Sequence, residues 1–99
     1  MPAVIHQPRV AWDGARAIVR AAAGPRSEDF AARILARLGS EEYGAFADTR
    51  HRLLTALVQT GGDRHAGDVE AGKWRVRLEE LLRSRPELTP AVQELIHED

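Results

Sequence analysis

The sequence has no cysteine, few aromatic residues and no long apolar run. Without cysteine the chain can form neither a disulfide framework nor a thiolate metal site, and a reducing cytoplasm is the expected location. The longest uninterrupted apolar runs are about the length of Ala21–Ala23, whereas a transmembrane helix needs about 20 apolar residues. Residues 1–14 also lack the basic start and apolar stretch of a secretion signal. We therefore expect a cytoplasmic protein that has no membrane partner.

The sequence also lacks an excess of charge of either sign. Its net charge is −1, which argues against a protein that binds nucleic acid through bulk electrostatics. Residues 1–40 carry six arginines against three acids, whereas residues 41–99 carry eight bases against twelve acids. This polarity could guide association between chains. It is more simply read as attraction between two halves of one fold, because exposed ion pairs are weak.

Length and composition indicate one globular domain over residues 1–99. The chain is 43% hydrophobic and 29% charged, and two separate cores would each be too small to fold alone. Helical periodicity is interrupted by Gly24-Pro25, Gly39, Gly61-Gly62 and Arg85-Pro86. The expected elements are an extended arm at 1–7, helices at 8–23, 27–38 and 40–60, a Gly-rich loop at 61–67, a helix ending at 84 and a last short helix from 89.

This pattern predicts an all-α fold, a compact four-to-five-helix bundle. The third and fourth helices are joined by a short loop and should form a central antiparallel hairpin. Ser27 and Ser40 are the expected N-caps of the second and third helices. On the first helix, Trp12 and Ile18 should supply most of the buried area, because their neighbours are alanines. Later helices should add Phe30, Ile34, Leu35, Leu38, Tyr43, Phe46, Leu53, Leu54, Leu57, Val58, Trp74, Leu78, Leu81, Leu82, Val92, Leu95 and Ile96.

The polar residues do not predict an enzyme. Asp63, His65 and Asp68 gather in the Gly-rich loop, but their spacing matches neither a calcium loop nor a zinc pattern. Asp48 and His51 are neighbours on one helix without an obvious nucleophile, so a surface ion pair is the simpler interpretation. We therefore assign no catalytic, metal-binding or cofactor-binding residue.

Nucleic-acid binding is the alternative hypothesis. A helix-turn-helix at Leu38-Gly39-Ser40 is disfavoured, because Leu35 stands where a small residue is needed and Glu41-Glu42 would face phosphates. A regulator that contacts nucleic acid would instead use arginines of the first half, provided that they converge on one face. These are Arg9, Arg16, Arg20, Arg33 and Arg37.

The leading hypothesis is a non-catalytic module for protein–protein interaction or self-association in a bacterial cytoplasm. Val76 lies about 200° from Trp74 on the helical wheel, so it should point away from the core. Val4 and Ile5 belong to the arm rather than to a core stripe. The predicted interaction surface therefore consists of Val4, Ile5, Arg75, Val76, Arg77 and Arg83, and its partner is another protein or a second copy of the chain.

Two segments resemble small uncharacterised helical proteins of GC-rich bacteria. They are Ala11-Trp12-Asp13, which opens the first helix, and Trp74-Arg75-Val76-Arg77-Leu78-Glu79-Glu80-Leu81-Leu82, followed by Pro86 and Glu94-Leu95. Thirteen of the 14 basic residues are arginine, which is also typical of such genomes. The resemblance implies a helical protein and no particular activity.

Overall fold

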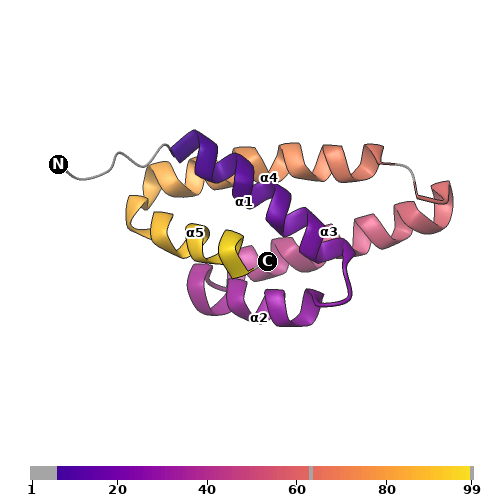
Figure 1. Cartoon of the computed structure of the whole chain (residues 1–99), viewed down its shortest axis with the longest axis horizontal. Coiled ribbons are helices and arrows are strands. Elements are labelled where there is room, and N and C mark those ends of the chain that lie inside the picture. The colour runs from indigo at the N-terminus through magenta and orange to yellow at the C-terminus, as the bar shows by residue number, and fades with distance from the viewer. Residues whose placement is uncertain (1–6, 63, 99) are drawn as a thin grey trace.

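The computed structural model describes residues 7–62 and 64–98, which form five α-helices and no strand. The helices are α1 (Gln7–Ala23), α2 (Ser27–Leu38), α3 (Ser40–Thr60), α4 (His65–Ser84) and α5 (Thr89–Glu98), and the short 3-10 turn η1 (Pro86–Leu88) precedes α5 (Figure 1). The predicted all-α bundle is confirmed. The predicted arm falls outside the described residues, Val4 and Ile5 included, except that Gln7 begins α1.

The first helix occupies the centre of the bundle. α1 contacts each of the other four α-helices and packs most extensively against α4. In Figure 1 it crosses diagonally over the predicted hairpin, whose α3 and α4 run in opposite directions. Its buried side is built almost entirely from small residues: Ala11, Ala15, Ala17, Ala21 and Ala22 are all buried, beside Ile18.

Gly14 is the point of closest approach between α1 and its neighbours. A Cβ atom built at this position would lie 2.9 Å from Cγ1 of Val92 on α5 and 3.0 Å from Cδ1 of Leu78 on α4. Both of these side chains are fully buried. The missing side chain of Gly14 therefore lets α4 and α5 meet the same turn of α1.

Trp12 is not a core residue, contrary to the sequence-based expectation. Its ring is 40% exposed, and the guanidinium groups of Arg16 and Arg75 lie 5.3 and 6.0 Å from the ring centroid. Because α1 approaches its neighbours through alanines and glycine, a large indole is placed at the edge of the contact rather than inside it.

Polar side chains join α3 to α4. Trp74 is only 2% exposed, and its Nε1 donates a hydrogen bond to Thr49 Oγ1 at 2.8 Å. The buried carboxylate of Glu42 accepts a hydrogen bond from Arg77 on α4. In the opposite direction, Arg52 on α3 donates to the buried carboxylate of Glu70 on α4 at 2.7 Å. The hairpin is thus fastened by groups on both helices.

The helix ends differ in detail from those expected. Ser27 and Ser40 are the first helical residues rather than N-caps; the N-cap positions are Arg26 and Gly39, without side-chain caps. Gly39 is the single residue between α2 and α3, and its φ is +101°. This positive φ favours glycine over other residues. Gly67 lies inside α4, which begins at His65, so the connection between α3 and α4 is shorter than the predicted Gly-rich loop at 61–67.

Within residues 7–62 and 64–98, no helix covers the outer side of the second half of α3. Leu57 and Val58 are 54% and 86% exposed, and Leu35, Tyr43 and Leu54 are also exposed. α2 has 12 residues and α3 has 21, so α2 is too short to cover the last turns of α3, which carry Leu54, Leu57 and Val58. Leu35 and Tyr43 instead each lie about 100° around the helix from a buried neighbour, Ile34 or Glu42. The expectation that these five side chains lie in the core is wrong, whereas Phe30, Ile34, Leu38, Phe46, Leu53, Leu78, Leu82, Val92 and Leu95 are buried.

Gly14→Ala should destabilise the protein by about 1–3 kcal/mol, because the strain of overpacking exceeds the gain in helix propensity. Gly44→Ala on α3 is the matched control. No atom lies within 4 Å of its added Cβ, so it should stabilise by up to about 1 kcal/mol. Urea unfolding of the two variants measures the difference. Equal stabilities would contradict the close approach at Gly14.

Trp74→Ala should lower the free energy of unfolding by about 3–5 kcal/mol, because it empties a buried aromatic site. Trp74→Phe keeps most of the ring but removes the donor to Thr49, and should lose about 1–3 kcal/mol. Chemical denaturation followed by circular dichroism gives both values. A loss below about 1 kcal/mol for Trp74→Ala would be incompatible with a buried anchor.

Candidate functional site

The described part of the predicted interaction surface lies on the outer side of α4. Val76 is 48% exposed and Arg75, Arg77 and Arg83 are exposed. Arg77 is engaged inside the protein, because it pairs with Glu42 and lies 5.7 Å from the ring centroid of Trp74. Arg75 lies 3.4 Å from Glu79. These contacts involve Arg75 and Arg77, so Val76 and Arg83 are the two members of this set that face outward.

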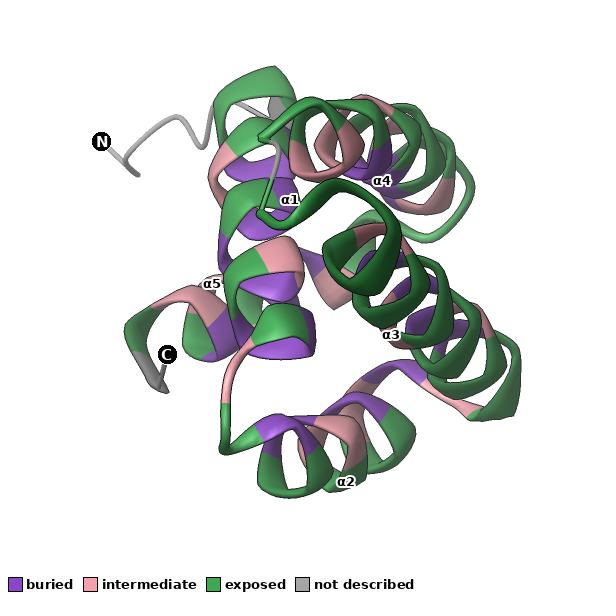
Figure 2. Ribbon diagram, turned by 90° about the vertical axis from the view of Figure 1, so that its right-hand side faces the viewer, coloured by how far each residue is buried: buried purple, intermediate pink, exposed green. Residues whose placement is uncertain are grey.

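A larger apolar surface lies where α3 ends. Leu54, Leu57 and Val58 follow one another on one side of its last turns, and this end of the molecule faces the viewer in Figure 2. Leu54 and Leu57 also line a groove with Val19 and Ala23 of α1. We call this the tip groove; its volume is about 250 Å³, and its remaining lining residues are Arg20, Leu53, Ala56, Gly62, Arg64, Ala66 and Gly67.

The tip groove continues between α1 and α4 as a wider depression. This depression has a volume of about 1000 Å³ and is lined by Trp12, Arg16, Val19, Arg20, Arg64, Gly67, Asp68 and Ala71. Val19, Arg20, Arg64 and Gly67 line both hollows. The combined surface has an apolar floor that extends from Trp12 to Leu57, and its charged rim carries three arginines against one aspartate.

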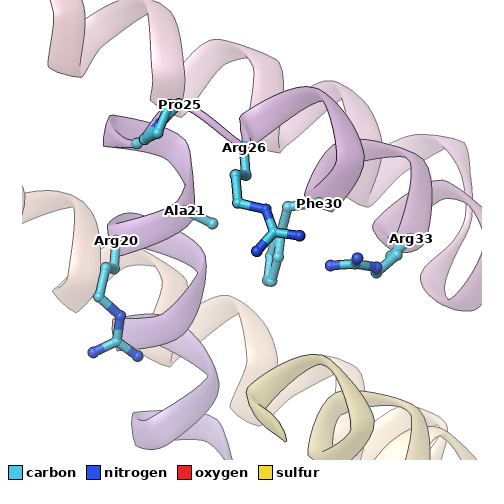
Figure 3. A pocket seen from close by; sticks show the side chains of 7 residues that line it. Arg20, Ala21, Pro25, Arg26, Phe30 and Arg33 are labelled. Carbon is cyan, nitrogen blue, oxygen red and sulfur yellow. The ribbon is translucent and has the colours of Figure 1, made fainter. Parts of the chain in front are cut away.

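A separate pocket lies between the end of α1 and the start of α2 (Figure 3). We call it the arginine pocket; its volume is about 230 Å³, and it is lined by Arg20, Ala21, Gly24, Pro25, Arg26, Phe30 and Arg33. In Figure 3 the side chains of Arg26 and Arg33 point toward one another beside Phe30. Among the residues that the structure describes, none that lines this pocket is acidic.

The turn that carries the arginine pocket is anchored to α3. Nη1 of Arg50 donates hydrogen bonds to the carbonyl oxygens of Ala22, at 2.7 Å, and Gly24, at 3.2 Å. Carbonyl groups at a helix C-terminus have no partner within the helix. Arg50 supplies that partner and fixes the turn before α2.

Glu70 is the most strongly perturbed carboxylate that the structure describes. Burial raises the pKa of Glu70, but hydrogen bonds and charges from Arg52 and Lys73 outweigh burial, so the pKa lies below its ordinary value. The hydrogen bond to Glu70 raises the pKa of Arg52. Because each of these groups is held in its charged form by a partner on the same protein, the arrangement is a structural ion pair rather than a poised acid or base.

The polar residues weighed as a metal site or catalytic pair are not brought together. Asp63 lies outside the described residues, and His65 and Asp68 are exposed at the start of α4. Asp48 and His51 are both exposed on α3. Within residues 7–62 and 64–98, no group of three or more His, Asp or Glu side chains could hold a metal ion. None of the helices in these ranges is long and apolar enough to cross a membrane.

Sequence reasoning missed both the tip groove and the arginine pocket. Leu54, Leu57 and Val58 recur with helical period, which predicts a buried stripe but not the helix that covers it. The unequal lengths of the second and third helices were the available signal. Arg26 and Arg33 are seven residues apart, a spacing that places the N-cap residue and a residue two turns later on the same side of α2; what the sequence does not show is the turn that brings the end of α1 beside them.

No family model matches the chain, and no curated protein or solved structure is similar enough to it to be counted as a match.

Glu70→Gln should destabilise the protein at neutral pH by about 1–3 kcal/mol, because it weakens the hydrogen bonds of a buried charged group. The lowered pKa means that ionised Glu70 contributes its full stability above the ordinary carboxyl pKa, and that this contribution is lost as the pH falls through the folded-state pKa. The stability difference between wild type and Glu70→Gln should therefore shrink as the solution is acidified. Unfolding free energies measured from pH 7 downward test this, and a difference independent of pH would contradict it.

Proposed function

We propose that this protein is a non-catalytic protein-interaction module that binds a helix of a partner protein along the tip groove. The observation that carries the proposal is the exposure of Leu54, Leu57 and Val58 on one side of α3, beside a hollow with an apolar floor. Burying an exposed aliphatic side chain of this size contributes about 1.5–3 kcal/mol. Contiguous exposed apolar patches are typical of binding surfaces, whereas scattered single residues are not.

The shape and charge of the combined groove favour an amphipathic helix with acidic flanks. From Trp12 to Ala23, α1 extends along the groove for about 16 Å, which corresponds to about three helical turns. Arg16 and Arg64 line its rim, where acidic residues beside an apolar stripe would be complementary to them. The absence of cysteine and the arginine bias support a bacterial cytoplasm as the location.

A second candidate is contact with nucleic acid. One observation favours it: Arg9, Arg16 and Arg20 are spaced so that they follow one side of α1. However, Arg9 lies 3.8 Å from Asp13, and Arg37 on α2 pairs with Glu94 at 3.0 Å. The five arginines therefore do not form one uninterrupted basic face, and the interaction module is the function that the geometry supports better.

Leu57→Asp should lower the affinity for an amphipathic helix at least about tenfold, because it places a charge in the apolar floor. The probe is a synthetic helical peptide with leucines at i, i+3, i+4 and i+7 and glutamates beside them, titrated in an isothermal calorimeter. Val76→Asp is the matched control, an equivalent change on an exposed aliphatic residue of α4. Circular dichroism checks that both variants keep the helical content of the wild type.

Three other results would contradict the proposal. A loss of affinity in Val76→Asp but not in Leu57→Asp would transfer the interface to the outer side of α4. A wild-type dimer in sedimentation velocity that Leu57→Asp dissociates would make a second copy of the chain the occupant. Tight duplex DNA binding that weakens steeply with salt would favour the nucleic-acid alternative, since phosphate contacts release counterions.

A further inference from the structure

We propose that the arginine pocket binds a small anion that carries a compact apolar group, such as a phosphate or carboxylate attached to an aromatic ring. The inference does not depend on the proposed interaction function. Of the lining residues, only Arg20 also lines the tip groove, so the two sites can be tested separately through Arg26 and Arg33.

Positive charge is concentrated in this pocket. Arg26 lies in the turn before α2 and Arg33 lies farther along that helix, and their side chains point toward one another (Figure 3). The lining residues include three arginines and no acid. Arg20 and Arg33 each also take part in another interaction of the protein. An anion placed between Arg26 and Arg33 would be attracted to both guanidinium groups.

The donor geometry suits a phosphate or carboxylate. A guanidinium group has five N–H donors in a planar fork and binds such anions through paired hydrogen bonds. Arg33 also takes part in another interaction of the protein, and a guanidinium group with five N–H donors can serve more than one acceptor at a time. Arg26 is exposed in the turn. An anion that enters from solvent can therefore meet both side chains.

The rest of the pocket is apolar, which restricts the ligand further. Phe30 is only 2% exposed, and Ala21 and Pro25 complete the wall beside it. Pro25 is exposed, so a ring attached to the anion could pack against it, whereas a bare inorganic ion would leave this apolar surface in contact with water. The volume of about 230 Å³ is below the usual range of about 300–1,000 Å³ for small-molecule pockets, so the apolar group must be compact.

The pocket is also held in place before any ligand arrives. Arg50 of α3 bonds the carbonyl oxygens of Ala22 and Gly24, which fixes the turn that positions Arg26. A site that is already ordered loses less conformational entropy on binding.

The experiment titrates the full chain with phenyl phosphate, benzoate, inorganic phosphate and phenol, and follows backbone amide shifts by NMR. Phenyl phosphate or benzoate should shift the amides of residues 20–33 in a saturable manner, and the stronger of the two identifies the preferred anion. Phenol should not bind, and inorganic phosphate should bind more weakly than phenyl phosphate. Equal affinity for the two phosphates would overturn the apolar part of the proposal.

Arg26→Gln should reduce the affinity for the better ligand at least about tenfold, because it removes a charge-assisted hydrogen-bond donor. Arg83→Gln on α4 is the matched control and should leave the affinity unchanged. Both residues are exposed, and matching amide spectra away from the substitutions would verify the fold. Equal loss in the two variants, or a wild-type dissociation constant weaker than about 10 mM, would overturn the proposal.

Discussion

The close approach of α1 to α4 and α5 is the constraint on which the rest of the structure depends. Gly14 leaves no room for a methyl group between itself, Leu78 and Val92, and the alanines around it let the helix pack deep in the bundle. Each small residue buries little apolar area of its own. Most of the stabilisation must therefore come from the larger side chains of the neighbouring helices, which are buried against α1. The large side chains of α4 and α5 gain their full burial only because α1 is narrow.

The polar links between α3 and α4 hold together two helices whose backbones this packing keeps apart. With α1 placed across the hairpin, the two helices meet largely through side chains that reach from one to the other. Each helix supplies one buried carboxylate and one arginine, so Glu42 pairs with Arg77 and Glu70 pairs with Arg52. A buried carboxylate without its partner would be strongly unfavourable. These pairs therefore fix the register of the hairpin more than they add to its stability.

The sequence predicted the helices well because their ends are marked by local chemistry. Glycine and proline at the end of a periodic apolar stretch are typical helix terminators, and Gly39 and Gly61 indeed adopt positive φ. Trp74 was correctly placed in the core, since it shares a stripe with Leu78. Exposure is harder to predict, because it depends on which helix lies opposite; periodicity cannot show that α2 ends before it reaches Leu57.

The same limitation explains the two candidate sites. A groove is a property of at least two elements, and the tip groove needs α1, α3 and α4 to be in place together. The arginine pocket depends on a turn whose path is set by Arg50 from a third helix. The spacing of seven between Arg26 and Arg33 indicates a shared side of α2, but no sequence pattern indicates which other helices lie against it. By contrast, the helical-wheel position of Val76, about 200° from the buried Trp74, was sufficient to predict its exposure, which is 48%.

The position of Gly14 also has a consequence for how the chain folds as it is made. Its two closest partners, Leu78 and Val92, lie near the other end of the sequence. During synthesis α1 leaves the ribosome first, and chains are made at only about 5–20 residues per second. The small-residue face of α1 stays uncovered until α4 and α5 have been synthesised, whereas α2 and α3 can pack together earlier. The packing around α1 is therefore completed only after α4 and α5 have been made, and a product that stops before them would expose the face of α1 that these helices cover.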